Sequence, residues 1–254
     1  MLLAATFIYF YTCTGTIVKV EAKFGKAVGH WEASKLLPKE LAIDVRDGCL
    51  LNNLQYDAHG KKLLAIVPAD ATVDASGKRN HRLVAFDLLS MHFAGSLVLP
   101  PTAAVPEIAP EGRVHFDMSD EQYESVVDAS KELQWVGGSR KRPAEAAVLD
   151  PAHQMAAKLS QGQHLSRLSL DGKHILVESK GGKLAVYSAL TGKQTTEGKW
   201  PDKGRFICLA PGGRLAFYNV DSRLQVIQLP GGTAKPVAAD VEIDRSATCV
   251  AAPQ

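Results

Sequence analysis

Few residues of this 254-residue sequence have the type and spacing that catalysis requires. His115 and Asp117 lie two apart in a β-rich segment, so their side chains would share one face of a strand. An imidazole beside a carboxylate can serve acid–base chemistry, although a strand histidine with one satisfied hydrogen bond is the commoner arrangement. The pair is therefore a candidate for acid–base catalysis, but the sequence does not identify the catalytic residues.

Two polar insertions could bind ions or partners. The first, Pro68–Asn80, contains side-chain oxygens spaced as in a calcium loop, but the EF-hand order and its final Glu are missing, so we expect a long solvated hairpin loop. The second, residues 137–163, opens with Gly137-Gly138-Ser139 and continues with the basic run 140–142. Arg140, Lys141 and Arg142 could dock an acidic partner or a phosphate or simply form a solvated loop. Pro143–Leu159 then resembles a helix, or two short turns broken at Pro151.

Motifs for metals, nucleotides and nucleophilic catalysis are missing from the sequence. The eight histidines form no HExxH, and there is no GxSxG elbow, Walker A loop or GxGxxG after a strand. The four cysteines form no CxxC pair; two disulfides are arithmetically possible, but ordinary buried thiols are the simpler interpretation. The four cysteines are Cys13, Cys49, Cys208 and Cys249. We therefore expect no cofactor and no metal.

Composition and charge narrow the class of protein. Lys and Arg number 29 against 27 Asp and Glu, a net charge of +2, which argues against a dedicated nucleic-acid binder. The apolar fraction of 46% argues against wholesale disorder, and no apolar run reaches the length of a membrane span. Met1–Cys13 is apolar and rich in β-formers but lacks a basic start, so we expect a buried strand there. The expected location is cytoplasmic, or periplasmic or secreted if residues 1–13 act as a signal segment or an upstream segment is missing.

Internal repeats indicate the architecture. Four segments each carry a short apolar stretch, a tight turn with glycine, a basic residue and a β-rich stretch: 55–67, 107–117, 168–177 and 208–218. Asp171-Gly172 and Gly212-Gly213 suit two-residue hairpin turns, because glycine tolerates positive φ. A second strand–turn–strand element recurs at 15–26, 81–90, 182–193 and 222–232, and less clearly at 124–133.

The repeat length indicates propeller blades. Gly172 and Gly213 are 41 residues apart, and a period of 40–45 residues with four strands is typical of a β-propeller. Trp31, Trp135 and Trp200 follow the second turn at similar distances, and we expect them to pack between neighbouring blades.

The segment 162–193 resembles a blade of the WD-repeat family. Gly162-Gln163-His164 stands near the family's Gly-His pair, Asp171-Gly172 at its hairpin turn and Thr191-Gly192-Lys193 at the turn after its third strand. Tyr187-Ser188 replaces the Trp-Asp dipeptide, so the repeats are more similar to the looser WD-like and YVTN-type propellers, which include the quinoprotein amine dehydrogenase β-chain-like group. The resemblance implies a propeller fold and a recognition role, and no catalytic residue is carried over from it.

The two ends of the sequence align with parts of one blade. Thr248–Gln254 matches the strand and turn at 207–213, and Leu2–Tyr11 matches the strand that follows, so both ends would build one sheet. We expect a single all-β propeller domain over 1–254 with about five four-stranded blades, either as a closed ring or as a fragment of a larger propeller. The blades would span 245–254 with 1–33, then 43–100, 105–136, 164–203 and 204–237, with 137–163 as a helical or loop insertion.

These features predict a non-catalytic propeller scaffold that binds a protein or another ligand. The expected partner is a protein, with no nucleic acid and no membrane span. The alternative is an enzyme, or an enzyme subunit of the quinoprotein dehydrogenase-like class, with its site at the mouth of the central channel.

Overall fold

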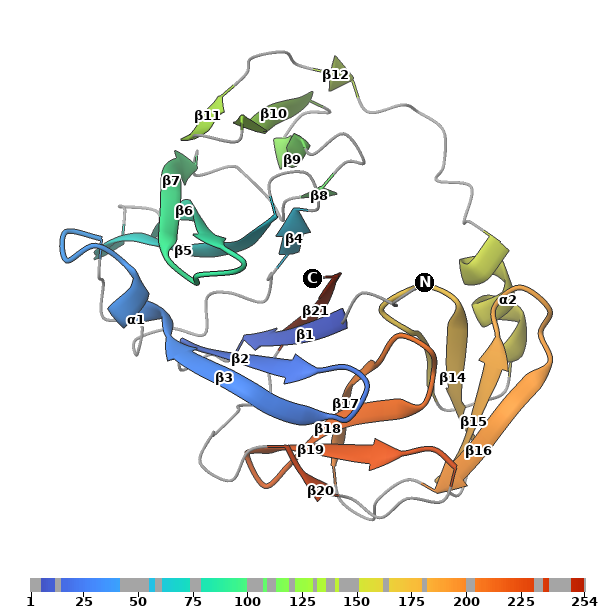
Figure 1. The fold of residues 1–254 in the computed structure, drawn as a ribbon. Coiled ribbons are helices and arrows are strands. Elements are labelled where there is room, and N and C mark those ends of the chain that lie inside the picture. Colours follow the sequence, from blue (N-terminus) through green and yellow to red (C-terminus); the bar gives the residue numbers. More distant parts are fainter. Residues whose placement is uncertain are drawn as a thin grey trace. The chain divides into compact units, whose positions relative to one another are not determined.

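The chain is all-β, and its described strands form four four-stranded sheets and one five-stranded sheet, all antiparallel, as in a β-propeller (Figure 1). This confirms the fold class predicted from the repeats. The computed structural model describes residues 6–11, 15–41, 55–57, 61–73, 79–99, 107–108, 113–118, 122–129, 132–135, 140–141, 151–161, 165–179, 182–199, 204–230, 235–237 and 248–253.

The residues divide into two compact units. Unit 1 comprises residues 1–12, 18–30 and 147–254, and unit 2 comprises residues 13–17 and 31–146. Each unit is described separately below. The single-domain assignment over 1–254 stays a prediction.

Two sheets of unit 1 follow each other along the chain, each with its strands in sequence order. The β13–β16 sheet contains β13 (Leu165–Leu168), β14 (His174–Glu178), β15 (Lys183–Ser188) and β16 (Gln194–Lys199). The β17–β20 sheet contains β17 (Arg205–Leu209), β18 (Leu215–Val220), β19 (Arg223–Gln228) and β20 (Lys235–Pro236).

A third sheet, here called the terminal sheet, joins the two ends of the chain. Its order is β21 (Thr248–Pro253), β1 (Thr6–Tyr11), β2 (Thr16–Glu21) and β3 (Lys26–Glu32). β1 and β21 pair antiparallel, from Thr6 opposite Pro253 to Tyr11 opposite Thr248. The predicted sheet shared by both ends is therefore confirmed, and so is the buried strand predicted near the start, because Ile8 and Phe10 are fully buried.

The core of unit 1 lies on both faces of the β17–β20 sheet. Along β18, Leu215 and Phe217 belong to the cluster shared with the terminal sheet, whereas Ala216 and Tyr218 belong to the cluster shared with the β13–β16 sheet. Successive side chains of a strand point to opposite faces, so a strand covered on both faces becomes a continuous apolar run. This explains why β18 shows no polar alternation before Asn219.

Helix α2 (Pro151–Leu159) covers the remaining face of the β13–β16 sheet. Its Met155 and Leu159 pack against a cluster that includes Ile175 and Val177 of β14. The helix begins at Pro151, because proline has no N–H and the first residues of a helix need none. Of the two predictions for residues 143–159, a helix is therefore confirmed from Pro151 onward; residues 143–150 lie outside the described residues.

Unit 2 contains two further antiparallel sheets and the short helix α1 (Ala33–Leu36). One sheet has β4 (Gln55–Asp57), β5 (Lys62–Val73), β6 (Arg79–Asp87) and β7 (Phe93–Leu99). The other has β8 (Glu107–Ile108), β9 (Arg113–Met118), β10 (Gln122–Ala129) and β11 (Glu132–Trp135), with β12 (Arg140–Lys141) paired to β10.

The predicted long loop at Pro68–Asn80 is wrong in extent. β5 continues to Val73 and β6 begins at Arg79, with a register shift between Pro68 and Val73. Strand pairing past the shift supplies partners to backbone groups that a loop would leave to solvent. The hairpin itself is as predicted.

Candidate functional site

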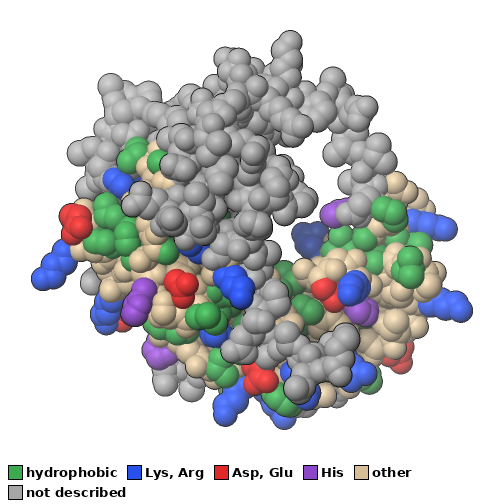
Figure 2. Space-filling model, turned by 45° about the horizontal axis from the view of Figure 1, so that its top comes forward, with side chains coloured by type: hydrophobic (Ala, Val, Ile, Leu, Met, Phe, Trp, Pro, Cys, Tyr) green, Lys and Arg blue, Asp and Glu red, His purple; other side chains and the backbone are tan. Residues whose placement is uncertain are grey.

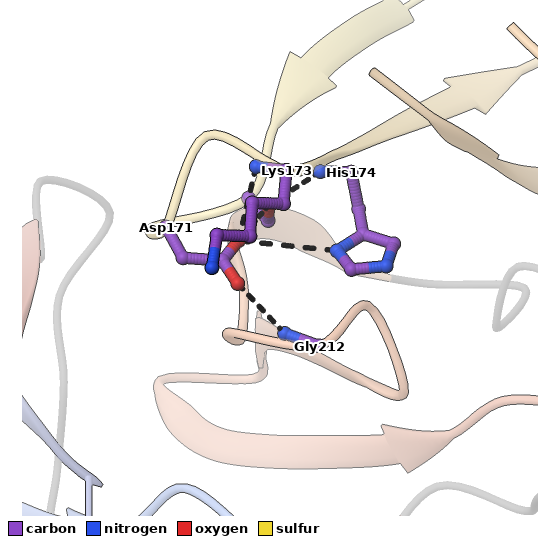
Figure 3. Close-up of polar contacts among 5 residues, drawn as sticks. Asp171, Lys173, His174 and Gly212 are labelled. Atoms are coloured by element: carbon purple, nitrogen blue, oxygen red, sulfur yellow. Dashed lines mark hydrogen bonds and ion pairs between the residues drawn. The ribbon is translucent and has the colours of Figure 1, made fainter. Parts of the chain in front are cut away.

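A group of polar contacts lies in the turn between β13 and β14 (Figure 3). The Asp171 carboxylate accepts hydrogen bonds at Oδ1 from the Ser169 hydroxyl (2.5 Å) and the Lys173 N–H (3.2 Å). Its Oδ2 accepts from the N–H of Gly212 in the next sheet, at 3.1 Å. The Ser169 hydroxyl oxygen in turn accepts from the His174 N–H at 2.9 Å. Each carboxylate oxygen of Asp171 thus accepts a hydrogen bond from a backbone N–H.

The protonation of Asp171 follows from these contacts. Partial burial raises the pKa of its carboxyl, but the hydrogen bonds from Ser169, Lys173 and Gly212 outweigh burial and hold the pKa below 3.8. The carboxylate is therefore ionised at neutral pH. A charged acceptor makes stronger hydrogen bonds than a neutral one, which suits a structural tie.

Serine, histidine and aspartate meet in this turn, but they do not form a catalytic triad. A triad requires the serine hydroxyl to donate to the imidazole, and the imidazole to be oriented by the carboxylate. Here the Ser169 hydroxyl donates to Asp171, and only the main-chain N–H of His174 reaches it. The His174 Nδ1 lies 3.9 Å from Asp171 Oδ1, too far for a hydrogen bond. The cluster therefore supplies no activated nucleophile.

The same turn joins two neighbouring sheets. The Leu170 N–H donates to the Leu209 carbonyl at 3.0 Å, and the Gly212 N–H donates to Asp171. The predicted two-residue turns are wrong: the Ser169 N–H pairs with the His174 carbonyl and the Ala210 N–H with the Leu215 carbonyl, so each loop has four residues. Side-chain acceptors on Ser169 and Asp171 stabilise the longer loop.

A second kind of turn recurs in four sheets, after the third strand. In each of these turns, a backbone N–H donates to the carbonyl of a residue at or just before the start of the second strand. The four bonds run from Ala22 to Thr6 (2.9 Å), Leu88 to Lys61 (3.0 Å), Ala189 to Lys173 (2.9 Å) and Leu229 to Arg214 (2.7 Å). The repeat seen in the sequence is therefore a repeat of backbone geometry. It brings the two turns of each sheet together at one end of the strands.

These bonds assemble one continuous end of unit 1, here called the turn surface. The turn after β15 is bonded to Lys173, the turn before β14 is bonded to Gly212, and a Cβ added to Gly25 in the turn after β2 would lie 3.0 Å from Val226 of the β17–β20 sheet. The exposed side chains of the turn surface include Lys23, Phe24, Lys26, Lys173, Leu190, Lys193 and Arg214.

The turn surface is positively charged. It has five exposed cations, whereas Asp171 is already hydrogen-bonded and Glu21 is half-buried. Two large apolar side chains stand among the cations: Phe24 is 62% exposed and Leu190 is 88% exposed. Unit 1 as a whole has 16 Lys and Arg against 10 Asp and Glu, whereas unit 2 has 13 against 17. Figure 2 shows lysine and arginine side chains projecting from the described part of the surface.

The structure places some of the sequence candidates. His115 and Asp117 both lie on β9, and their side chains lie outside what the structure describes. Arg140 and Lys141 form β12, so this part of the predicted basic loop is a short strand; Arg142 lies outside the described residues. The acid–base and partner roles of these residues stay predictions.

Two of the three tryptophans share a position in the described sheets. Trp31 and Trp135 lie at the ends of the outermost strands β3 and β11, and Trp31 is half-buried. Trp200 lies outside the described residues. Packing of the three tryptophans between blades stays a prediction.

Among the described residues, no group of three His, Cys, Asp or Glu side chains could hold a metal ion. No helix in the described ranges is long and apolar enough to cross a membrane. A catalytic site at the mouth of a central channel stays a prediction.

Sequence reasoning missed the turn surface as a site. The signal was present: a basic residue follows the turn glycine in DGK, GGR, TGK and FGK. Only the bonds between turns show that these four segments gather at one end.

No protein-family model matches the chain, and no curated protein matches it. Among solved structures, the chain is similar to the β-propeller domain of Cps50 (Swd1) from Myceliophteria thermophila, with 15% identity and a TM-score of 0.31. The match covers 96% of this chain and 71% of that one. The fold assignment above stands on the strand pairing.

Proposed function

We propose that the chain is a non-catalytic protein-interaction scaffold, and that its turn surface binds an acidic segment of a partner protein. The observation that carries the proposal is the set of five exposed cations at one end of unit 1. Complementary charges on two surfaces speed their association, and they favour partners whose charge has the opposite sign.

The two exposed apolar side chains favour a protein segment over a bare polyanion. Phe24 and Leu190 can each bury apolar area against a partner, whereas a phosphate chain offers none. We therefore expect the bound segment to combine Asp or Glu with a few apolar residues.

The backbone of the turn surface is held in position before binding. Asp171 and three of the recurring backbone bonds, donated by Ala22, Ala189 and Leu229, fix the turns, so little conformational entropy is lost when a partner binds. We also propose that the repeats are of the WD-like, YVTN type, because Asp171-Gly172-Lys173 and Thr191-Gly192-Lys193 form turns at the positions where such repeats have them.

Binding of a fluorescent peptide that alternates Asp and Glu with Leu tests the proposal by anisotropy. The test variant carries Lys173→Glu, Lys193→Glu and Arg214→Glu, and we expect its affinity to fall by about tenfold or more. The control carries Lys183→Glu, Lys199→Glu and Arg223→Glu, which are equally exposed and lie at the opposite strand ends of the same sheets.

The control changes the net charge by the same amount and should retain affinity to within about twofold. Equal losses in both variants would show that only net charge matters, and the proposal would fail. Tighter binding to a DNA duplex than to the peptide would also contradict it.

A further inference from the structure

Two thiols face each other between neighbouring sheets of unit 1. Cys208 lies on β17 and is buried, and Cys249 lies on β21 and is half-buried. The two side chains are in hydrogen-bond contact, and Cys249 packs against the same apolar cluster that contains Cys208. Both are free thiols in the structure.

The strand register explains why the thiols meet. Cys208 is paired across strands with Phe217, and Cys249 with Phe10. Side chains that are directly paired lie on the same face of a sheet. The Phe10 and Phe217 rings contact each other with centroids 5.0 Å apart. The facing surfaces of the two sheets therefore each present one phenylalanine and one cysteine to the other.

The repeat places the cysteines at equivalent positions. They are 41 residues apart in the sequence, the same separation as Gly172 and Gly213. Each lies within the first strand of its sheet. The juxtaposition thus comes from the architecture and not from the path of a loop.

We propose that Cys208 and Cys249 form a disulfide that links the β17–β20 sheet to the terminal sheet. The oxidant is a small disulfide such as oxidised glutathione. The half-buried Cys249 loses its proton and its thiolate attacks one sulfur of the oxidant, forming a mixed disulfide and releasing one glutathione thiolate. Cys208 then loses its proton and attacks the Cys249 sulfur, which releases the second glutathione. Two protein thiols are oxidised and one glutathione disulfide is reduced to two thiols.

The environment makes the second step slow and the product durable. Burial and the neighbouring Cys249 raise the pKa of the Cys208 thiol, so little thiolate is present at neutral pH. Once formed, the bond is shielded from reductants on the Cys208 side, because that residue is 4% exposed. The link closes a loop that spans one whole repeat.

Peptide mapping of the native chain tests the proposal directly. The protein is incubated folded with oxidised glutathione, alkylated, digested with trypsin and analysed by mass spectrometry without reductant. Cleavage after Arg205, Arg214 and Arg245 leaves Cys208 in the peptide 206–214 and Cys249 in the peptide 246–254. We expect these two peptides to appear joined, two hydrogens lighter than their sum, and to separate on reduction.

Thermal melts give a second readout. Oxidation should raise the Tm of the native chain by about 5–10 °C, a shift typical of a disulfide that closes a loop of this length. The Cys249→Ser variant should show no such shift, whereas the Cys13→Ser/Cys49→Ser variant should keep it. Free or glutathione-capped Cys208 and Cys249 in the oxidised folded protein, or pairing with other cysteines, would overturn the proposal.

Discussion

Two turns at the same repeat position are stabilised in different ways. In the β13–β14 turn, the side chains of Ser169 and Asp171 accept backbone N–H groups. In the β17–β18 turn, the corresponding residues are Ala210 and Gly212, which have no side-chain acceptor, and the chain instead uses positive φ at both Gly212 and Gly213. Glycine adopts that conformation without steric cost.

The difference shows that one turn depends on the other. The turn that lacks acceptors receives one from its neighbour, because Asp171 accepts the Gly212 N–H. The turn with side chains thus stabilises itself and the next sheet. Mutations in the two turns should therefore fail for different physical reasons, and the following experiments test that contrast.

The largest effect is expected from Gly213→Ala. A Cβ at this position would lie 2.8 Å from the His174 Cγ, and the residue has a φ of +68°. We expect a loss of about 3 kcal/mol in the free energy of unfolding, measured by urea denaturation. The matched control is Gly172→Ala, where φ is also +68° but no atom lies within 4 Å; it should cost only about 1 kcal/mol. Equal costs would show that packing against His174 is unimportant.

The next largest effect is expected from Asp171→Ala. The substitution removes the acceptor for the Lys173 and Gly212 N–H groups and the partner of the Ser169 hydroxyl. We expect a loss of about 2 kcal/mol, because hydrogen bonds to a charged group are stronger than neutral ones. Hydrogen exchange should rise at the Gly212 amide, across the sheet boundary, and unchanged exchange there would contradict the tie between sheets.

A double-mutant cycle measures how far Ser169 and Asp171 act together. Ser169→Ala removes a donor to Asp171 and an acceptor for the His174 N–H. Because the two side chains share one network, the double variant should be less destabilised than the sum of the single variants, with a coupling of about 1 kcal/mol. Additive losses would show that the contacts of the two side chains are independent.

The smallest effect is a change in pH dependence. The pKa of Asp171 is lower in the folded chain than its ordinary value of 3.8, so its stabilisation is complete above pH 3.8 and is lost as the pH falls through the folded pKa. The native chain should therefore lose stability on acidification below pH 3.8 more steeply than Asp171→Asn. Urea midpoints at a series of pH values measure the difference, and parallel curves would contradict it.

The sequence predicted the sheets well because their signals are local and repeated. Alternating and continuous β-formers around a glycine turn define each strand pair, and the period located the sheet built from both ends of the chain. The sequence also predicted positive φ at Gly172 and Gly213, which the structure confirms.

The candidate site was harder to predict because it depends on contacts between repeats. Both first-hairpin loops have four residues, with or without side-chain acceptors, a length that a dipeptide pattern does not encode. The bond from the Gly212 N–H to Asp171 joins two repeats, so no local pattern reveals it. The turn surface and the Cys208–Cys249 contact both require two segments about one repeat apart to lie side by side. Spacing alone is compatible with many such arrangements.

The pairing of β1 with β21 has a consequence for synthesis. During synthesis β1 leaves the ribosome long before its partner, residues 248–253. Until then β1 exposes an unpaired edge and an apolar face, a state that favours aggregation or capture by a chaperone. Completion of this sheet should be a slow stage of folding, because β1 and β21 are far apart along the sequence.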